Sequence, residues 1–248
     1  MKISEDVINR VNNIYWGYDT KKQVIKKPKD LAVLTSYSSF GKNNTNGPIG
    51  VANALFNKEE VTVIMLGGTQ IREGQATSYN ECKLCFYEKD NDYIKDVKDV
   101  IMTLDKKKPL IISGVSLGGM IAQQILSLKD ITDNFNIKSI ICFGSPIVFP
   151  LYHKDYRVIR FVEKGDAVPK FGNINPKKFR YRKLYKELEN KEKIMFDGKY
   201  KTKVECHALS YVELKEFDKY DFYGVLNGNN TLELLEDIRY FDAPVIKC

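Results

Sequence analysis

Residues 109–129 read PLIISGVSLGGMIAQQILSLK and contain the turn on which the fold prediction depends. The first part, PLIISG (109–114), is a short apolar run of the kind that forms a buried strand. From Gly118 to about Lys129, apolar residues return at helical spacing, which predicts a helix. Ser116 lies between the two, with one glycine two positions before it and another two positions after it. The stretch therefore predicts a sharp strand-to-helix turn with a serine at its apex.

The apolar segments around this turn predict an α/β fold. Further strands are expected at 30–37, 61–66, 138–144 and 157–163, and further helices at 3–14 and 91–105. Strands that are apolar on both faces and alternate with helices indicate a mostly parallel central sheet, covered by helices on both faces. We therefore predict a single domain over residues 1–248, interrupted by a long connection without clean periodicity at about 70–90.

Composition excludes several classes of protein. The chain has 248 residues, of which 43% are hydrophobic and 29% charged, as in an ordinary globular protein. No apolar signal region follows the N-terminal lysine, and no apolar run is long enough to span a bilayer, so we expect a cytoplasmic protein. Five scattered cysteines are a poor disulfide framework. Cys82 and Cys85 form a C-x-x-C pair without a nearby second pair or histidine, so we expect ordinary thiols and no zinc site.

The positive charge is concentrated in one segment. Residues 177–203 hold 11 basic and four acidic side chains, an excess equal to the +7 of the whole chain. We interpret this basic insertion first as a solvated helical face, with an anionic membrane surface as the alternative partner. A nucleic-acid partner is not expected, and nothing in the sequence indicates an oligomeric state.

The glycine-flanked serine predicts nucleophilic chemistry. A serine hydroxyl must be exposed and activated to attack an acyl carbon, and a strand-to-helix turn lifts it above the sheet. The start of the helix also presents backbone N–H groups to a developing oxyanion. The alternative interpretation is a glycine-rich packing turn that happens to contain a serine.

The base and the acid follow from their order in the chain. Hydrolases of this architecture carry serine, then an acid, then histidine. The chain has two histidines: His207, in VECHALSYVEL after every predicted strand, is preferred as the base. His153, in PLYHKDY beside a proline, is the alternative and is expected on a surface loop. RVIRFVEKGDAVPKFG (157–172) provides a strand followed by Asp166, which we expect at the same sheet edge as Ser116. An ordinary Gly-Asp turn is the alternative there.

Residues 30–212 resemble the class 3 (fungal-type) lipases of the α/β-hydrolase fold. The resemblance rests on five segments in order: VIMLGGTQ (63–70), GVSLGG (114–119), CFGSP (142–146), RVIRFVEKGDAVPKFG (157–172) and ECHALSYVE (205–213). Val115 stands where the family usually has histidine, and Gly67 where arginine often precedes Gly-Thr. These departures count against triglyceride as the substrate more than they count against hydrolysis by a serine.

The resemblance implies a role for individual residues. Ser116 would be the nucleophile, Asp166 the acid and His207 the base, while Thr69 and the backbone N–H of Leu117 would form the oxyanion hole. Residues 70–90 would occupy the place of the family's lid. No metal or organic cofactor is implied.

The predicted function is a serine hydrolase that cleaves carboxylic esters of lipids through an acyl-enzyme, as a lipase or phospholipase does. Two alternatives stay open. One is a soluble short-chain carboxylesterase or acyltransferase, and the other is a catalytically silent α/β-hydrolase scaffold that binds a partner.

Overall fold

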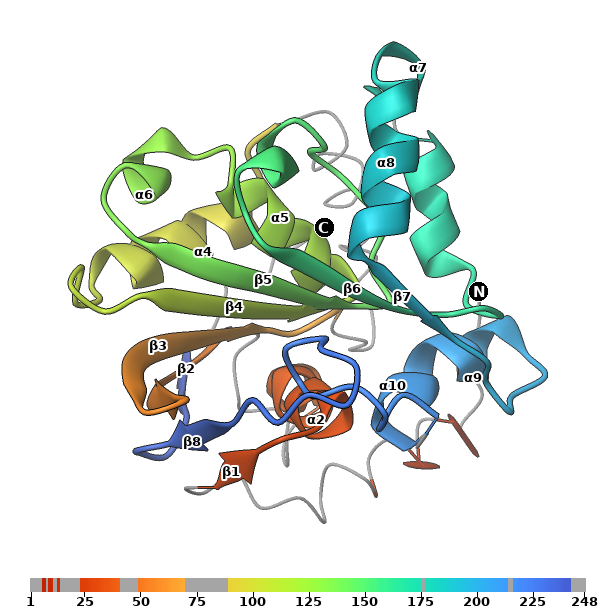
Figure 1. Cartoon of the computed structure of the whole chain (residues 1–248), viewed down its shortest axis with the longest axis horizontal. Coiled ribbons are helices and arrows are strands. Elements are labelled where there is room, and N and C mark those ends of the chain that lie inside the picture. The colour runs from red at the N-terminus through yellow and green to blue at the C-terminus, as the bar shows by residue number, and fades with distance from the viewer. Residues whose placement is uncertain are drawn as a thin grey trace.

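A computed structural model of the chain describes residues 6, 7, 9, 10, 13, 23–40, 49–69, 89–174, 177–213 and 216–241. Its centre is a mixed sheet in the order β1-β8-β2-β3-β4-β5-β6-β7, with β9 paired to β2 (Figure 1). The strands are β1 (Val24–Ile25), β2 (Ile49–Phe56), β3 (Glu59–Leu66), β4 (Leu110–Val115), β5 (Ile137–Phe143), β6 (Val158–Glu163), β7 (Lys193–Phe196), β8 (Leu232–Leu234) and β9 (Arg239–Phe241). The five strands from β3 to β7 run parallel, whereas β2 is antiparallel to β3.

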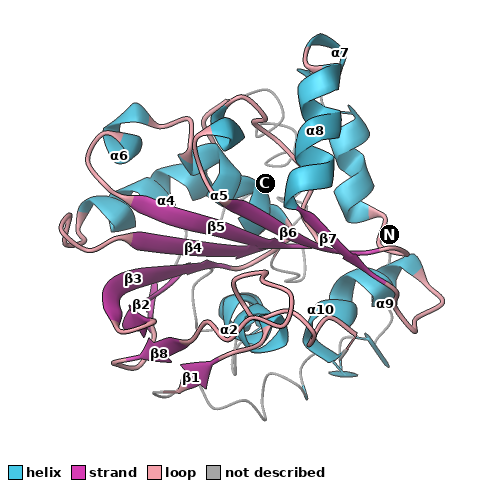
Figure 2. Ribbon diagram, in the orientation of Figure 1, coloured by secondary structure: helices cyan, strands magenta, loops and turns pink. Residues whose placement is uncertain are grey.

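Helices cover both faces of the sheet (Figure 2). The α-helices are α2 (Pro28–Phe40), α4 (Asp92–Met102), α5 (Leu117–Ile125), α6 (Lys129–Thr132), α7 (Lys177–Arg180), α8 (Arg182–Glu192), α9 (Lys203–Ala208) and α10 (Ser210–Glu213), and two short 3-10 helices are η2 (Tyr152–Lys154) and η3 (Val168–Ile174). Helices α4, α5 and α6 pack on one face and α2 and α10 on the other. The predicted α/β-hydrolase architecture is therefore confirmed.

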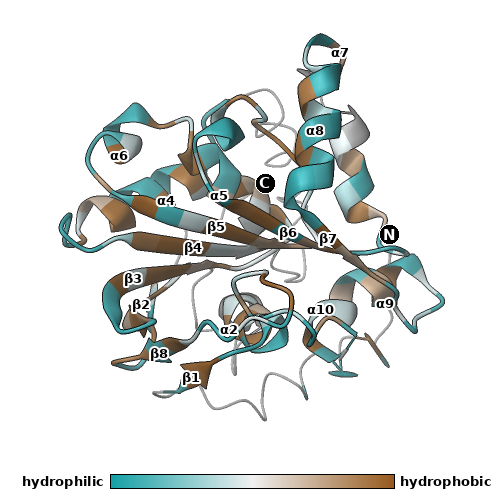
Figure 3. Cartoon of the chain, in the orientation of Figure 1, coloured by the Kyte–Doolittle hydropathy of each residue, from teal (hydrophilic) through white to brown (hydrophobic). Residues whose placement is uncertain are grey.

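The core consists of two apolar layers separated by the sheet. Figure 3 shows the hydrophobic colour concentrated on the strands between the helical layers. Ile64 and Ile112 face the layer that contains α4 and α5, whereas Val63 and Ile111 face the layer that contains α2. Because successive side chains of a strand point to opposite faces, strands buried on both sides read as continuous apolar runs.

One expectation for the first 60 residues needs correction, and one strand there was not predicted. Residues 30–37 are helical, as part of α2, and do not form a strand. The strand beside β3 is instead β2, which pairs with it residue for residue from Ile49↔Leu66 to Phe56↔Glu59. Leu31, Ala32, Val33 and Leu34 are all buried, so α2 lacks the polar stripe that normally reveals a helix.

Other expectations fall partly or wholly on residues outside the described ranges. In the predicted N-terminal helix, residues 6, 7, 9, 10 and 13 are described and are helical. Most of the lid-like segment, residues 70–88, lies outside the described residues, as do Cys82, Cys85 and Cys248. Among the described helices, none combines the length and the hydrophobicity that crossing a bilayer requires.

Candidate active site

The strand-to-helix turn at Ser116 has the geometry that the sequence predicts. Strand β4 ends at Val115 and helix α5 begins at Leu117, so Ser116 alone makes the reversal. Its backbone has φ 53° and ψ −119°, a combination rare for residues with a side chain. Such a conformation costs about 1–3 kcal/mol and persists only where the surroundings fix it. Here the Ser116 N–H donates to the Phe143 carbonyl at 2.9 Å, which ties the turn to β5.

The flanking glycines are required because backbone approaches backbone at this turn. A Cβ on Gly114 would lie 2.4 Å from the Gly118 carbonyl oxygen. A Cβ on Gly118 would lie 2.1 Å from the carbonyl oxygen of Leu66, the last residue of β3. Neither neighbour is a flexible side chain that could move aside, so any larger residue at these positions would displace the turn. Ser145 supports the turn further, because its Oγ donates to the Ser116 carbonyl at 2.7 Å.

Asp166 lies at the same sheet edge as Ser116, one strand beyond β5. Parallel register aligns the ends of these strands, with Val115 opposite Phe143 and Phe143 opposite Phe161. Strand β6 ends at Glu163, and a short turn then places Asp166 in the interior with 0% of its surface exposed. A fully buried carboxylate needs several hydrogen-bond donors to remain charged.

Three groups supply hydrogen bonds to the Asp166 carboxylate. Oδ1 accepts from the Val168 N–H at 2.8 Å. Oδ2 lies 2.8 Å from His207 Nδ1 and accepts from the Tyr211 hydroxyl at 2.7 Å. The pKa of Tyr211 is held well above its usual range, first by burial and then by the negative charge of Asp166. Tyr211 therefore remains a protonated donor and orients the carboxylate.

His207 connects the carboxylate to the serine. Its Nε2 lies 2.9 Å from Ser116 Oγ, on the side of the ring opposite the bond to Asp166. Because an ionised Asp166 can only accept, Nδ1 carries the proton and Nε2 is the acceptor for the Ser116 hydroxyl. The side chain is 20% exposed, in contrast to the fully buried Asp166. Ser116, His207 and Asp166 thus form a continuous hydrogen-bonded chain from solvent-accessible groups into the core.

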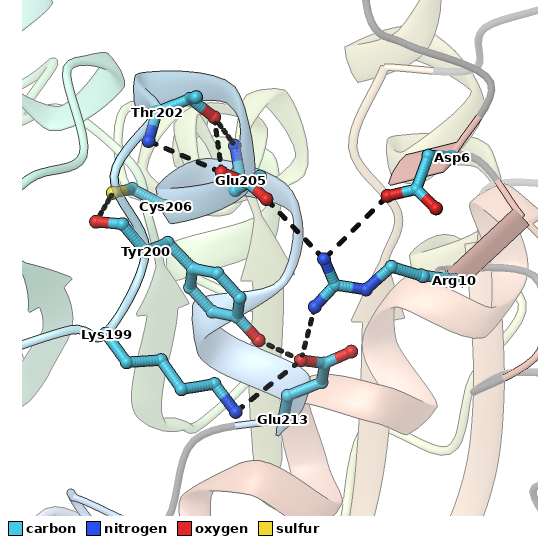
Figure 4. Close-up of polar contacts among 8 residues, drawn as sticks. All are labelled: Asp6, Arg10, Lys199, Tyr200, Thr202, Glu205, Cys206 and Glu213. Carbon is cyan, nitrogen blue, oxygen red and sulfur yellow. Dashed lines mark hydrogen bonds and ion pairs between the residues drawn. The ribbon is translucent and has the colours of Figure 1, made fainter.

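The helix that carries His207 is held at its start by several polar contacts (Figure 4). At its start, the Thr202 hydroxyl accepts a hydrogen bond from the Glu205 N–H. The Glu205 carboxylate accepts one from the Thr202 N–H, which completes a capping box. Arg10 adds a clamp from the N-terminal region, with one nitrogen 3.5 Å from Glu205 Oε1 and another 3.2 Å from Glu213 Oε2. Figure 4 also shows the Tyr200 hydroxyl bonded to the Glu213 carboxylate. These contacts join α9 to α10 and limit the movement of His207.

The two residues expected at an oxyanion hole lie on either side of the turn. Leu117 is the first residue of α5, where backbone N–H groups have no partner within the helix. Thr69 is partly exposed and follows Gly68, on which a Cβ would lie 3.2 Å from the Cβ of Ser116. The tip of β3 therefore passes directly beside the serine. Tyr93 holds this segment by donating to the Gly67 carbonyl at 3.0 Å.

His153 occupies a different environment from the one expected. Its side chain is 0% exposed, so the prediction of a surface loop is wrong. Nδ1 lies 2.9 Å from Glu192 Oε1 at the end of α8, and Nε2 has no hydrogen-bond partner among the described residues. This histidine joins α8 to the segment after β5 and is not hydrogen-bonded to Ser116.

Sequence reasoning missed three residues that support the candidate site: Tyr211, Ser145 and Arg10. Tyr211 lies one helical turn after His207, and helical spacing alone would have placed both side chains on one face. The contact of Ser145 with the turn had no signal beyond its place in CFGSP. Arg10 had none at all, because its partners lie 195 and 203 residues away.

Comparison with known proteins supports a hydrolase-type fold. Residues 87–203, a little less than half of the chain, match the family model described as a PGAP1-like alpha/beta domain. The matched segment contains Ser116 and Asp166 and ends just before His207. No curated protein matches the chain. The match is to a hydrolase-like α/β fold and does not extend to the class 3 lipase family.

Proposed function

We propose that this chain is a serine hydrolase of carboxylic esters, with Ser116 as nucleophile, His207 as general base and Asp166 as the acid that orients it. The observation that carries the proposal is the hydrogen-bonded sequence Ser116 Oγ–His207 Nε2 at 2.9 Å and His207 Nδ1–Asp166 Oδ2 at 2.8 Å. Distances of this size lie within the range needed for proton transfer between a nucleophile and its base. The strained turn at Ser116 adds independent support, because strain is retained where it serves a site.

The proposed mechanism follows from these positions. His207 Nε2 takes the hydroxyl proton as Ser116 Oγ attacks the ester carbonyl carbon, and Asp166 stabilises the imidazolium that forms. The backbone N–H of Leu117, together with the N–H or hydroxyl of Thr69, would hold the oxyanion, each donor contributing about 3–4 kcal/mol. His207 then returns the proton to the leaving alcohol. Water, activated by the same histidine, attacks the acyl-enzyme and releases the carboxylic acid.

We propose lipid esters as the substrate class on the basis of the class 3 lipase resemblance. A soluble short-chain ester is the competing substrate class, and nitrophenyl esters of increasing acyl length distinguish the two. A rise in kcat/KM with chain length supports lipid esters. A maximum at acetate or propionate would instead identify a short-chain esterase.

Covalent labelling tests the serine nucleophile itself. A fluorophosphonate probe reacts only with an activated serine, so the wild-type chain should be labelled and Ser116→Ala should not. Ser127→Ala is the matched control, because Ser127 caps the end of α5 by bonding to the Gln124 carbonyl and lies outside the proposed site. Labelling of Ser116→Ala at the wild-type rate would exclude this nucleophile. Absence of labelling in a folded wild-type chain would favour the silent scaffold.

A further inference from the structure

One aromatic side chain is presented to solvent almost without cover. Phe179, in α7, is 99% exposed, more than any other large apolar side chain among the described residues. Single exposed apolar residues are normal on a protein surface. A phenyl ring with nearly its whole surface in water, however, contributes none of the stabilising free energy that its burial would provide. Figure 1 shows α7 and α8 rising away from the sheet, with α7 at the far end. Phe179 is therefore carried on a projection.

The residues around Phe179 are basic, and the first acid that follows them in the sequence is Glu187. We call residues 177–186, KKFRYRKLYK, the α7–α8 tip; it holds six lysines and arginines and no aspartate or glutamate. Within the described part of the chain, no ion pair involves Arg180, Arg182 or Lys183, and these three side chains are exposed. Arg180 lies 5.8 Å from the Tyr181 ring centroid. The tip thus combines an exposed aromatic ring with three exposed cations that form no ion pair among the described residues.

The lower part of α8 has the opposite character and attaches the tip to the body. Glu189 pairs with Arg160 at 3.0 Å and also with Lys193, while Glu192 binds the buried His153. Tyr185, at the end of the tip that joins the rest of α8, and Leu188 pack against Ile147, in the segment after β5. Two of the three acids of the helix, Glu189 and Glu192, therefore serve internal contacts that hold the base of the projection, whereas Glu187 is exposed. This arrangement orients the tip outwards.

The tip is also connected to the proposed catalytic acid. The Val168 N–H bonds to Asp166 Oδ1, and Val168 begins η3, which contacts α7. Phe171 of η3 is 52% exposed and adds a second apolar side chain on this connection. The chain thus leads from Asp166 through η3 to α7. A surface that contacts the tip would lie on this side of the molecule.

We propose that the α7–α8 tip docks this chain on an anionic lipid surface. Lysine and arginine side chains at a membrane are attracted to acidic headgroups, while an aromatic ring enters the boundary between headgroups and acyl chains. A nucleic-acid duplex would satisfy the charges, but its bases are already stacked on one another and would leave the ring of Phe179 in water. Docking deepens the proposed function, because it would hold a lipid ester hydrolase at its substrate. The effect of docking on turnover rests on that proposed function, whereas vesicle binding itself does not.

Vesicle binding tests the proposal without catalysis. Ser116→Ala protein is sedimented with phosphatidylcholine vesicles that contain phosphatidylserine and with vesicles of phosphatidylcholine alone. We expect binding to the anionic vesicles that weakens as salt is raised, because screening shortens the reach of each charge. Adding Arg180→Gln, Arg182→Gln and Lys183→Gln should weaken binding on the order of 100-fold, at about five-fold for each cation. Adding Phe179→Ser alone should weaken it by about ten-fold, even at high salt.

A matched control removes the same charge elsewhere. Lys58, Lys107 and Lys129 are exposed and precede β3, β4 and β5, at the opposite sheet edge from Ser116. Their replacement by glutamine should leave vesicle binding almost unchanged. Equal losses in the two triple variants would show that only net charge matters and would overturn the proposal. Unchanged binding of Phe179→Ser, combined with tighter binding of the tip to duplex DNA than to vesicles, would overturn it in favour of a nucleic-acid partner.

The same proteins separate failure of docking from failure of the proposed function. Loss of vesicle binding in the tip variants, with fluorophosphonate labelling of Ser116 retained in the active background, supports docking as a separate property. A chain that is labelled but binds vesicles no better than the triple tip variant would overturn docking and leave the serine hydrolase intact. A chain that binds vesicles through the tip but is never labelled would overturn only the proposed function.

Discussion

The two histidines of this chain form similar pairs with a carboxylate but have different surroundings. His207 Nδ1 lies 2.8 Å from Asp166, and His153 Nδ1 lies 2.9 Å from Glu192. The far nitrogen of His207 reaches Ser116 Oγ, whereas the far nitrogen of His153 has no hydrogen-bond partner among the described residues. His207 is also partly exposed, and His153 is fully buried. The two pairs therefore differ in the third group, because only His207 is also hydrogen-bonded to a serine among the described residues.

The difference lies in what each pair connects. His207 belongs to a short helix at the carboxyl edge of the sheet, and its ring lies between a buried acid and a strained serine. His153 follows β5 in a 3-10 turn and holds the end of α8 against the body. We accordingly expect the first pair to control turnover and the second to control stability.

The largest effect is expected from His207→Ala. Without a base at Nε2, Ser116 stays a weak nucleophile, and kcat should fall by about 10⁴-fold while the free energy of unfolding changes little. Steady-state hydrolysis of a nitrophenyl ester, combined with urea unfolding, measures both quantities. If His207→Ala kept near-wild-type turnover, the two histidines would not differ in the proposed way.

His153→Ala should show the reverse pattern. Removing one partner of a buried pair leaves the Glu192 carboxyl without compensation, so the free energy of unfolding should drop by about 3 kcal/mol or more. The kcat of the protein that remains folded should stay close to the wild-type value. A double variant with Glu192→Gln should lose less stability than the two single variants added together, since both break the same contact. Strict additivity would contradict the pairing.

A smaller effect is expected from Tyr211→Phe. The ring keeps its contacts with Phe143 and Phe196, but Asp166 Oδ2 loses the hydroxyl that lies 2.7 Å away. We expect kcat to fall by about ten-fold with KM nearly unchanged, equivalent to about 1.4 kcal/mol. Tyr185→Phe is the matched control, because the buried Tyr185 hydroxyl has no hydrogen-bond partner among the described residues. A shared loss of kcat in both variants would point to general destabilisation instead.

The strand-to-helix turn and the acid segment could be predicted from sequence because their signals are local. Gly114, Ser116 and Gly118 specify the turn within five residues, and β6 and Asp166 follow one another directly. The parallel register then places both at one sheet edge. Contacts between residues that are distant in the sequence could not be predicted from such local signals. The approach of Arg10 to Glu205 depends on how the completed fold brings together segments that lie 195 residues apart in the sequence.

The errors in the prediction also have physical causes. Helix α2 is buried on most of its surface, so its apolar residues show no period that separates it from a strand. A local signal was nevertheless present, since Pro28 is the first residue of α2 and Asp30 lies in the first turn, both typical of a helix start. The burial of His153 was hidden because its partner, Glu192, comes 39 residues later.

The pairing of β1 with β8 affects the order in which the protein can mature during synthesis. Val24 pairs with Glu233, so this edge of the sheet joins segments that lie far apart in the sequence. Contacts between such distant residues form slowly and require both segments to have left the ribosome. The strands from β3 to β6 and the turn at Ser116 can assemble earlier, whereas α9 and its contact with Arg10 must wait. We therefore expect a nascent chain to form the turn at Ser116 before the segment that carries His207 has left the ribosome.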